Sequence, residues 1–235
     1  MEGERGLIER LSAIALLLLT AHALWVHASA GEVEPLEVVA LEALWAPVLL
    51  RAPCDKRALL VVFAGFSGYF LPRLIPYDAF LKLAITDVIF NNYVLRPLGV
   101  EMKVTNGEIV IFYDQRPYAV YAVGCSSLRS GAFLALMPLA ARGSLGRRLL
   151  AAALGYLLSY PFNALRVAAI VVAGEALGAD PFLAHLLVSP LASVLIATLI
   201  MVVQELVLPG YLEEVSEGVE CLLKLAKPWW RSRST

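Results

Sequence analysis

Long apolar runs are the feature that most constrains how this chain can fold. The two longest extend over Leu149–Leu177 and Pro181–Leu208. Because about 20 apolar residues in a helix are enough to cross the hydrocarbon core of a bilayer, each run predicts a membrane span. Of the 235 residues, 60% are hydrophobic and the mean hydropathy is +0.74, above the level of a soluble domain. Further spans are predicted at Leu7–His27, Leu36–Leu50, Ala58–Ile75 and Ser126–Ala141. We therefore expect an all-α polytopic membrane protein with about six transmembrane helices.

Clusters of basic residues occupy the short segments beside these runs. Alternating spans place all the clusters on one side of the membrane, and the positive-inside rule makes that side the cytoplasm. The first run is longer than the apolar core of a signal peptide, so it is predicted to be an uncleaved span. We expect a multi-pass protein of the cell membrane with both termini cytoplasmic, a single transmembrane domain over residues 1–209 and a cytoplasmic amphipathic tail over 210–235. The clusters are Arg5 and Arg10; Arg51, Lys56 and Arg57; Arg142, Arg147 and Arg148; and Lys224, Lys227, Arg231 and Arg233.

The longest external segment, residues 76–124, has a pattern of its own. Apolar residues recur at helical spacing over Tyr77–Leu95, against a polar side that includes Asp87, which predicts an amphipathic helix on the membrane surface. Asn106-Gly107 then separates two runs rich in Val, Ile, Tyr and Phe, which is a strong hairpin signal. A second turn near Asp114 leads to a third run. We expect a small external antiparallel sheet directly before Cys125.

Three reactive or charged side chains fall at one predicted depth. A helix rises about 1.5 Å per residue. Counted from the cytoplasmic side, Cys125, Arg166 and His185 each lie near the outer boundary of a core about 30 Å thick. An arginine within an apolar helix is a functional hypothesis by default, because its burial in lipid is costly. The sequence thus predicts an external site that three different helices build.

The residue types in this site suit acyl transfer. Cys125 opens a predicted helix, whose N-terminus favours a thiolate nucleophile. Arg166 would stabilise negative charge and His185 would carry protons, while Asn163 and Ser126 are the expected supporting residues. Taken singly, each main residue has another reading: a small buried cysteine, an arginine that reaches the head groups, and an interfacial histidine.

Other features narrow the chemistry. Cys54 and Cys221 fall on the predicted cytoplasmic side, where thiols are expected to stay reduced. The sequence shows no metal-ligand cluster, phosphate-binding Gly-rich loop or Ser-His-Asp pattern, so no cofactor is expected. The net charge of −1 carries no basic stripe that would predict nucleic-acid binding.

The motif residues resemble a known family. Gly124-Cys125-Ser126-Ser127-Leu128, then Pro161-Phe162-Asn163-Ala164-Leu165-Arg166-Val167, then His185, are similar to the exosortase/archaeosortase family over about residues 106–208. That family often has Gly two residues after the cysteine, where this chain has Ser127. The resemblance implies a membrane cysteine transpeptidase that cleaves C-terminal sorting signals. Its substrates would end in a short motif, a transmembrane helix and a basic cluster, and a membrane lipid is the possible acceptor.

Two rival classes stay open at this point. In one, the chain is a non-enzymatic transporter or assembly subunit in which Arg166 binds an anion. A thiol at the same level argues against this class, because a transporter does not need one. In the other, the chain is a related membrane enzyme that transfers an acyl or lipid group to a different acceptor.

Overall fold

The computed structural model describes residues 54–70, 72, 75, 77–121 and 125–231. They divide into two compact units: residues 64–214 form one, and the residues before 64 combine with those from 215 onward in the other. Most of the described chain is helical, with one small antiparallel sheet, as the sequence predicts. In chain order the elements are α3 (Lys56–Phe70), α4 (Tyr77–Leu95), η2 (Arg96–Leu98), β1 (Val100–Thr105), β2 (Glu108–Tyr113), β3 (Arg116–Val120), α5 (Ser127–Ala140), α6 (Leu145–Leu177), α7 (Pro181–Val207) and α8 (Tyr211–Arg231).

Two of the described helices, α6 and α7, are long and apolar enough to cross a membrane. Along α7 most apolar side chains are exposed, among them Phe182, Leu191 and Leu195. A helix that is apolar on all sides and buries little of that surface within its own protein suits a lipid environment. By contrast, α5 has 14 residues and α3 has 15. At about 1.5 Å per residue, each is shorter than a hydrocarbon core of about 30 Å.

The count of six spans therefore stays a prediction. The predicted spans Leu7–His27 and Leu36–Leu50 lie outside the described residues. The apolar run expected over Ala58–Ile75 gives a helix only to Phe70. One boundary was wrong: α6 begins at Leu145, so Arg147 and Arg148 lie in its first turn and not in a loop. There, Nη1 of Arg148 donates a hydrogen bond to the carbonyl of Leu139 at 2.9 Å.

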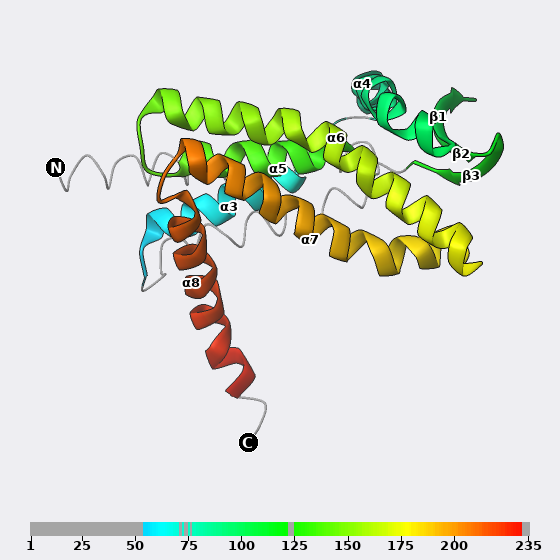
Figure 1. Ribbon diagram of the computed structural model, residues 1–235. Helices are drawn as coiled ribbons and strands as arrows, with labels where there is room; N and C mark the ends of the chain where they lie inside the picture. Colours follow the sequence, from blue (N-terminus) through cyan, green and yellow to red (C-terminus); the bar gives the residue numbers. More distant parts are fainter. Residues whose placement is uncertain (1–53, 71, 73–74, 76, 122–124, 232–235) are drawn as a thin grey trace, which may run out of the picture. The chain divides into compact units, whose positions relative to one another are not determined.

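Helices α5, α6 and α7 lie side by side in the larger unit (Figure 1). Gln204 of α7 is fully buried and joins them, because its Nε2 donates to the carbonyls of Leu134 at 2.7 Å and Ala151 at 2.9 Å. Gly155 makes this approach possible, since a Cβ there would overlap the Leu134 carbonyl. In Figure 1, α6 changes direction along its length, and Pro161 lies inside it. A proline within a helix removes one main-chain hydrogen bond and favours such a bend.

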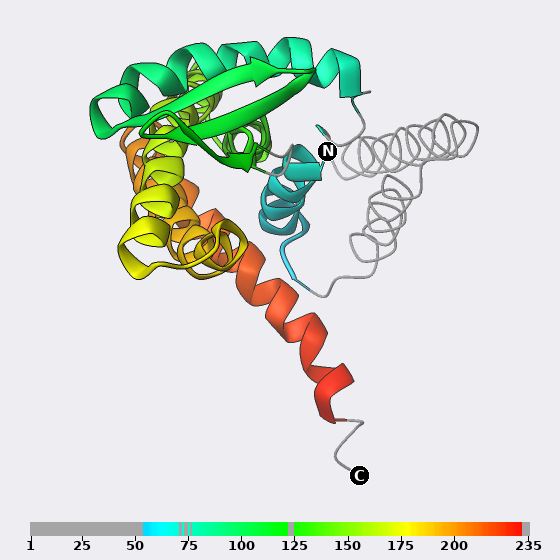
Figure 2. The ribbon, with the colours of Figure 1, turned by 90° about the vertical axis from the view of Figure 1, so that its right-hand side faces the viewer.

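The three strands form a meander in the order β1-β2-β3, and every pair is antiparallel. Asn106 and Gly107 have positive φ, as a two-residue type I′ hairpin requires, and Asp114 and Gln115 repeat the pattern at the second turn. Helix α4 lies along this sheet (Figure 2). Asn92 of α4 bonds both backbone groups of Met102, through Oδ1 at 2.8 Å and Nδ2 at 2.9 Å. The side chain thus occupies the outer edge of β1.

The predicted polar face of α4 needs a correction. The helix has the predicted bounds, but Asp87 is fully buried, while Leu83, Phe90 and Tyr93 are exposed. The sequence pattern predicted that Asp87 points outward, because Asp78, Lys82 and Asp87 are all charged and were assigned to one polar face. In the structure Asp87 has hydrogen-bond partners inside, and these offset the cost of its burial. The core between α4, the sheet and α6 contains Phe80, Ala84, Leu95, Val100, Met102, Ile109, Ile111, Tyr121, Ala164, Val167, Ala168 and Val171.

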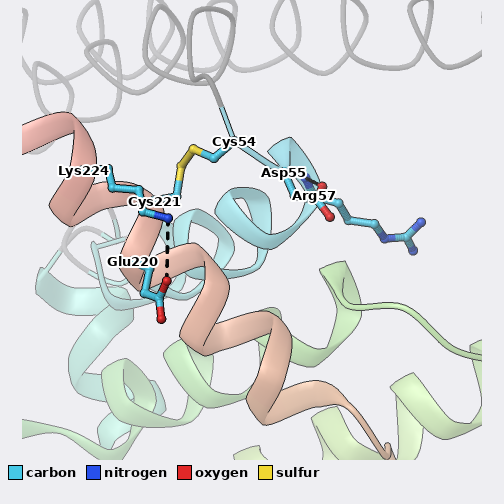
Figure 3. Close-up of a disulfide and its surroundings, with 6 residues drawn as sticks. All are labelled: Cys54, Asp55, Arg57, Glu220, Cys221 and Lys224. Atoms are coloured by element: carbon cyan, nitrogen blue, oxygen red, sulfur yellow. Dashed lines mark hydrogen bonds and ion pairs between the residues drawn. A yellow bond between two sulfur atoms is a disulfide. The ribbon is translucent and has the colours of Figure 1, made fainter.

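In the smaller unit, a disulfide joins Cys54 to Cys221, with 5.9 Å between their Cα atoms (Figure 3). The expectation that both thiols are reduced is thus not met. The two cysteines meet because the start of α3 packs closely against α8: a Cβ on Gly218 would overlap the carbonyl of Ala58. Leu59 and Cys221 are both buried there.

Candidate active site

Cys125 and His185 form the reactive pair of the candidate site. Sγ of Cys125 lies 3.2 Å from Nε2 of His185, although 60 residues separate them in sequence. His185 is held near the start of α7, where Oδ1 of Asp180 accepts hydrogen bonds from the Phe182 and Leu183 amides and Pro181 fills the first helical position. Cys125 is half-buried and His185 is exposed. The thiol therefore has a proton acceptor in hydrogen-bond contact and stays accessible to a reactant.

Arg166 reaches the same place from α6, but it contacts the backbone of the cysteine. Its Nη2 donates to the carbonyl of Cys125 at 2.9 Å, and its Nη1 donates to Oγ of Ser193 at 3.2 Å. Its buried Nε finds no hydrogen-bond acceptor among the described residues. The guanidinium thus fixes the main chain at the thiol and keeps donor capacity for another group.

A second set of buried groups lies behind the cysteine. The hydroxyl of Tyr121 lies 2.7 Å from the Cys125 carbonyl and 3.1 Å from Oδ2 of Asp87. Asn163, on α6, donates from Nδ2 to this hydroxyl at 2.9 Å. Asn163, which the sequence predicts as a supporting residue, thus contacts Tyr121, and Tyr121 in turn contacts the cysteine backbone.

The N-terminus of α5 is capped by another helix. Ser126 is its N-cap residue, but its own side chain makes no capping hydrogen bond. Instead, Oδ2 of Asp87 accepts from the amide of Ser127 at 2.9 Å. Cys125 stands one residue before the cap, and the carboxyl of Asp87 meets the positive end of the helix dipole. Asp87 therefore occupies this helix end, while the thiol of Cys125 contacts His185.

Burial dominates the electrostatics behind the site. It raises the pKa of Asp87 above its usual range, against the hydrogen bonds from Ser127 and Tyr121, which lower it. Burial, and next the nearby Asp87, raise the pKa of Tyr121 well above its ordinary value. The phenol is therefore neutral at physiological pH and acts as a hydrogen-bonding group.

A groove of about 270 Å³ opens beside Arg166. Its apolar lining is Phe66, Tyr69, Phe133, Leu134, Ile196 and Ala197. Its polar lining is Ser130, Ser159, Asn163, Arg166 and Ser193. An apolar cleft with a few convergent polar groups is the usual form of a binding site. Because Arg166 belongs to both the groove and the cysteine contact, a ligand in the groove would lie next to the reactive pair.

The sequence predicts Cys125, Arg166 and His185 as site residues, and the structure brings these three residues together. Sequence reasoning missed Asp87, Tyr121 and Ser193. Tyr121 stood in an apolar strand pattern, and Ser193 is a small polar residue in a long apolar run, so neither stood out. Ser193 lies eight residues after His185, which is the spacing of one helix face, and this was the available signal. Within the part of the chain that the structure describes, no group of three or more His, Cys, Asp or Glu residues could hold a metal ion.

The fold and site define a class of protein: a helical membrane protein in which the segment before α5 brings a cysteine to an arginine of α6 and a histidine of α7, beside a small sheet. The family model described as transmembrane exosortase matches residues 4–203. The chain therefore belongs to the transmembrane exosortase family. The match extends well beyond the motif region and includes the N-terminal half. No curated protein and no solved structure matches the chain significantly.

Proposed function

We propose that this exosortase-family protein is a membrane cysteine transpeptidase that cleaves a C-terminal sorting signal and transfers the upstream protein to an acceptor. The observation that carries the proposal is the contact of 3.2 Å between Sγ of Cys125 and Nε2 of His185. A thiol paired with an imidazole is the usual arrangement of a cysteine acyl-transfer enzyme. A simple transporter would not need a thiol paired with an imidazole.

In the first half of the reaction, His185 takes the proton from Cys125 and the thiolate attacks a backbone carbonyl of the sorting signal. A carbon–sulfur bond forms, and then the carbon–nitrogen bond breaks. His185 gives its proton to the leaving amine. In the second half, an acceptor amine, alcohol or water attacks the thioester and loses a proton to His185. The acyl–sulfur bond breaks and Cys125 recovers its thiol.

Arg166 suits the stabilisation of negative charge during both attacks. Two of its nitrogens already bind the Cys125 carbonyl and Ser193, which orients the guanidinium without using all of its five N–H groups. Donors fixed before the reaction stabilise a developing oxyanion without further reorganisation. The polar side of the groove gives a substrate carbonyl a path to these donors.

The substrate we propose is a protein that ends in a short motif, one transmembrane helix and a basic cluster. The apolar side of the groove suits part of such a helix, and the acceptor would be a membrane lipid or another nucleophile. The motif itself would extend along the sheet by strand addition. Because Asn92 occupies the edge of β1 at Met102, β3 is the edge that we expect to receive it. The site would face the outside of the cell membrane.

The test is processing of such a substrate, tagged at its N-terminus, in membranes that contain the full chain. Cys125→Ala should abolish cleavage, while Cys54→Ala serves as the matched cysteine control and should keep it. With Cys125 intact, the transient thioester should be released by hydroxylamine as a hydroxamate of the tagged fragment. Cleavage at the normal rate by Cys125→Ala would rule out the thiol mechanism.

A further inference from the structure

A buried carboxyl group outside the reactive pair connects to the cysteine through two separate routes. Asp87, on α4, is fully buried and belongs to neither the groove nor the Cys–His contact. Its Oδ2 accepts the Ser127 amide at 2.9 Å and contacts the Tyr121 hydroxyl at 3.1 Å. Ser127 is two residues after the cysteine, and Tyr121 contacts the cysteine carbonyl. Both routes end at the short turn that carries the thiol.

Several side chains anchor this turn together with Asp87. The N-cap residue Ser126 makes no capping bond of its own, so Asp87 supplies the acceptor for the first amide of α5. The Cys125 carbonyl is bound from two sides, by Arg166 at 2.9 Å and by Tyr121 at 2.7 Å. Asn163 completes the set by donating to the Tyr121 hydroxyl. Small displacements of a nucleophile cost large factors in rate, so anchors of this kind matter for reactivity.

The hydrogen bonds at the Tyr121 hydroxyl indicate which proton Asp87 would carry. The phenol owns a single proton, but it lies within hydrogen-bond distance of two acceptors, the Cys125 carbonyl and Asp87. If Asp87 carries a proton, the carboxyl donates to the phenol oxygen and the phenol donates to the carbonyl. All contacts around the phenol are then true hydrogen bonds, with Asn163 as the second donor.

We propose that Asp87 is a positioning residue, which caps α5 and acts through Tyr121 to hold Cys125 against His185. The contacts of the carboxyl are with the Ser127 amide and the Tyr121 hydroxyl, so its effect reaches the thiol through the backbone of residues 125–127. The proposal deepens the proposed function and rests on it for the identity of the reaction. The positioning itself can be measured without any substrate.

The experiment measures the rate at which iodoacetamide alkylates Cys125 in the purified full-length protein, by mass spectrometry at neutral pH. Cys54 and Cys221 are joined in a disulfide, whereas Cys125 is not in a disulfide. We expect Asp87→Ala and Tyr121→Phe each to slow alkylation about tenfold, the equivalent of one lost hydrogen bond. Asp87→Asn keeps an acceptor for the Ser127 amide and should slow the alkylation less.

Asn91→Ala is the matched control: Asn91 is buried one turn later on α4, and its Nδ2 contacts the sulfur of Met102, away from Cys125. It should leave the rate within about twofold, since only packing changes.

A double-mutant cycle separates positioning from general loosening. If Asp87 acts by holding the thiol at His185, Asp87→Ala should add little to the slowing that His185→Ala already causes. Equal slowing by Asn91→Ala, full additivity in the cycle, or wild-type alkylation in folded Asp87→Ala and Tyr121→Phe would overturn the proposal. If Asp87→Ala does not fold, Tyr121→Phe and Asp87→Asn decide the question. Failure of the proposed function appears separately, as substrate cleavage by Cys125→Ala.

Discussion

The guanidinium of Arg166 donates a hydrogen bond to the backbone carbonyl of Cys125, at 2.9 Å. The same guanidinium holds Ser193 of α7 at 3.2 Å. One side chain of α6 therefore links the segment before α5 to the helix that carries His185. The guanidinium therefore helps to position the parts of the site, and we expect it also to stabilise the negative charge that develops during the reaction.

Substitution of Arg166 tests this double role. Arg166→Ala should lower kcat for cleavage about 100-fold or more, the usual effect of removing an oxyanion donor. Arg166→Lys should recover little, because an ammonium group lacks the planar fork that reaches two partners. Ser193→Ala removes one partner only and should cost about threefold to tenfold. A fully active Arg166→Ala protein would contradict the role assigned to the guanidinium.

Substitution of His185 tests the reactive pair. His185→Gln should slow the alkylation of Cys125 at neutral pH about tenfold or more, because the thiol loses the base that stabilises its ionised form. Cleavage should be slowed rather than abolished if water carries the proton in its place. His22 and His27, which lie outside the described residues, provide control substitutions that should leave the alkylation rate unchanged. An unaltered rate in His185→Gln would separate the histidine from the thiol chemistry.

The stability of the protein should depend on pH through Asp87. Burial raises the pKa of this carboxyl in the folded protein above its unfolded value of about 3.9. The folded state then binds the proton more tightly, so this contribution to stability is fully present below about pH 3.9 and is lost as the pH rises through the raised pKa. Asp87→Asn cannot ionise. The difference in thermal midpoint, variant minus wild type, should therefore increase between about pH 4 and pH 8 in detergent. A difference that decreases over this range would mean that the folded state lowers the pKa instead.

Thiol labelling tests both the disulfide and the orientation. On intact cells, a membrane-impermeant maleimide should label Cys125 alone, and the label should disappear in Cys125→Ser. Denaturation with a reductant should expose all three cysteines, since Cys54 and Cys221 are joined. If the basic clusters are cytoplasmic, an impermeant reductant followed by the maleimide should leave Cys54 and Cys221 unlabelled until the membrane is permeabilised. Labelling without permeabilisation would reverse the predicted orientation.

Glycine substitutions test the contact between α5, α6 and α7. Gly155→Ala should destabilise the protein by about 1 to 3 kcal/mol, because its Cβ would overlap the Leu134 carbonyl and the Gln204 amide. Gly146→Ala is the matched control on the same helix, where an added Cβ meets nothing within 4 Å. It should be neutral or slightly stabilising, since alanine favours helix more than glycine. Equal midpoints for the two variants in thermal unfolding would argue against this close approach.

Several elements could be predicted from the sequence because local patterns encode them. The bounds of α4 match the predicted helix, and the hairpin at Asn106-Gly107 follows from residues that tolerate positive φ. The long apolar runs predicted the bounds of α6 and α7 to within a few residues. The start of α6 was missed because Arg147 and Arg148 resemble loop residues, although basic side chains are compatible with a helix.

The sequence by itself determined the helical membrane character, the hairpin turns and the residue types of the candidate site. These depend on composition, period and backbone preference, which act over a few residues. Only the tertiary structure decided that Asp87 points inward, that Tyr121 binds the Cys125 carbonyl and that Arg166 contacts the backbone of the cysteine. These contacts join residues from 4 to 41 positions apart. The burial of a carboxyl depends on partners that distant segments supply, so no local pattern distinguishes Asp87 from the other acidic residues of the sequence.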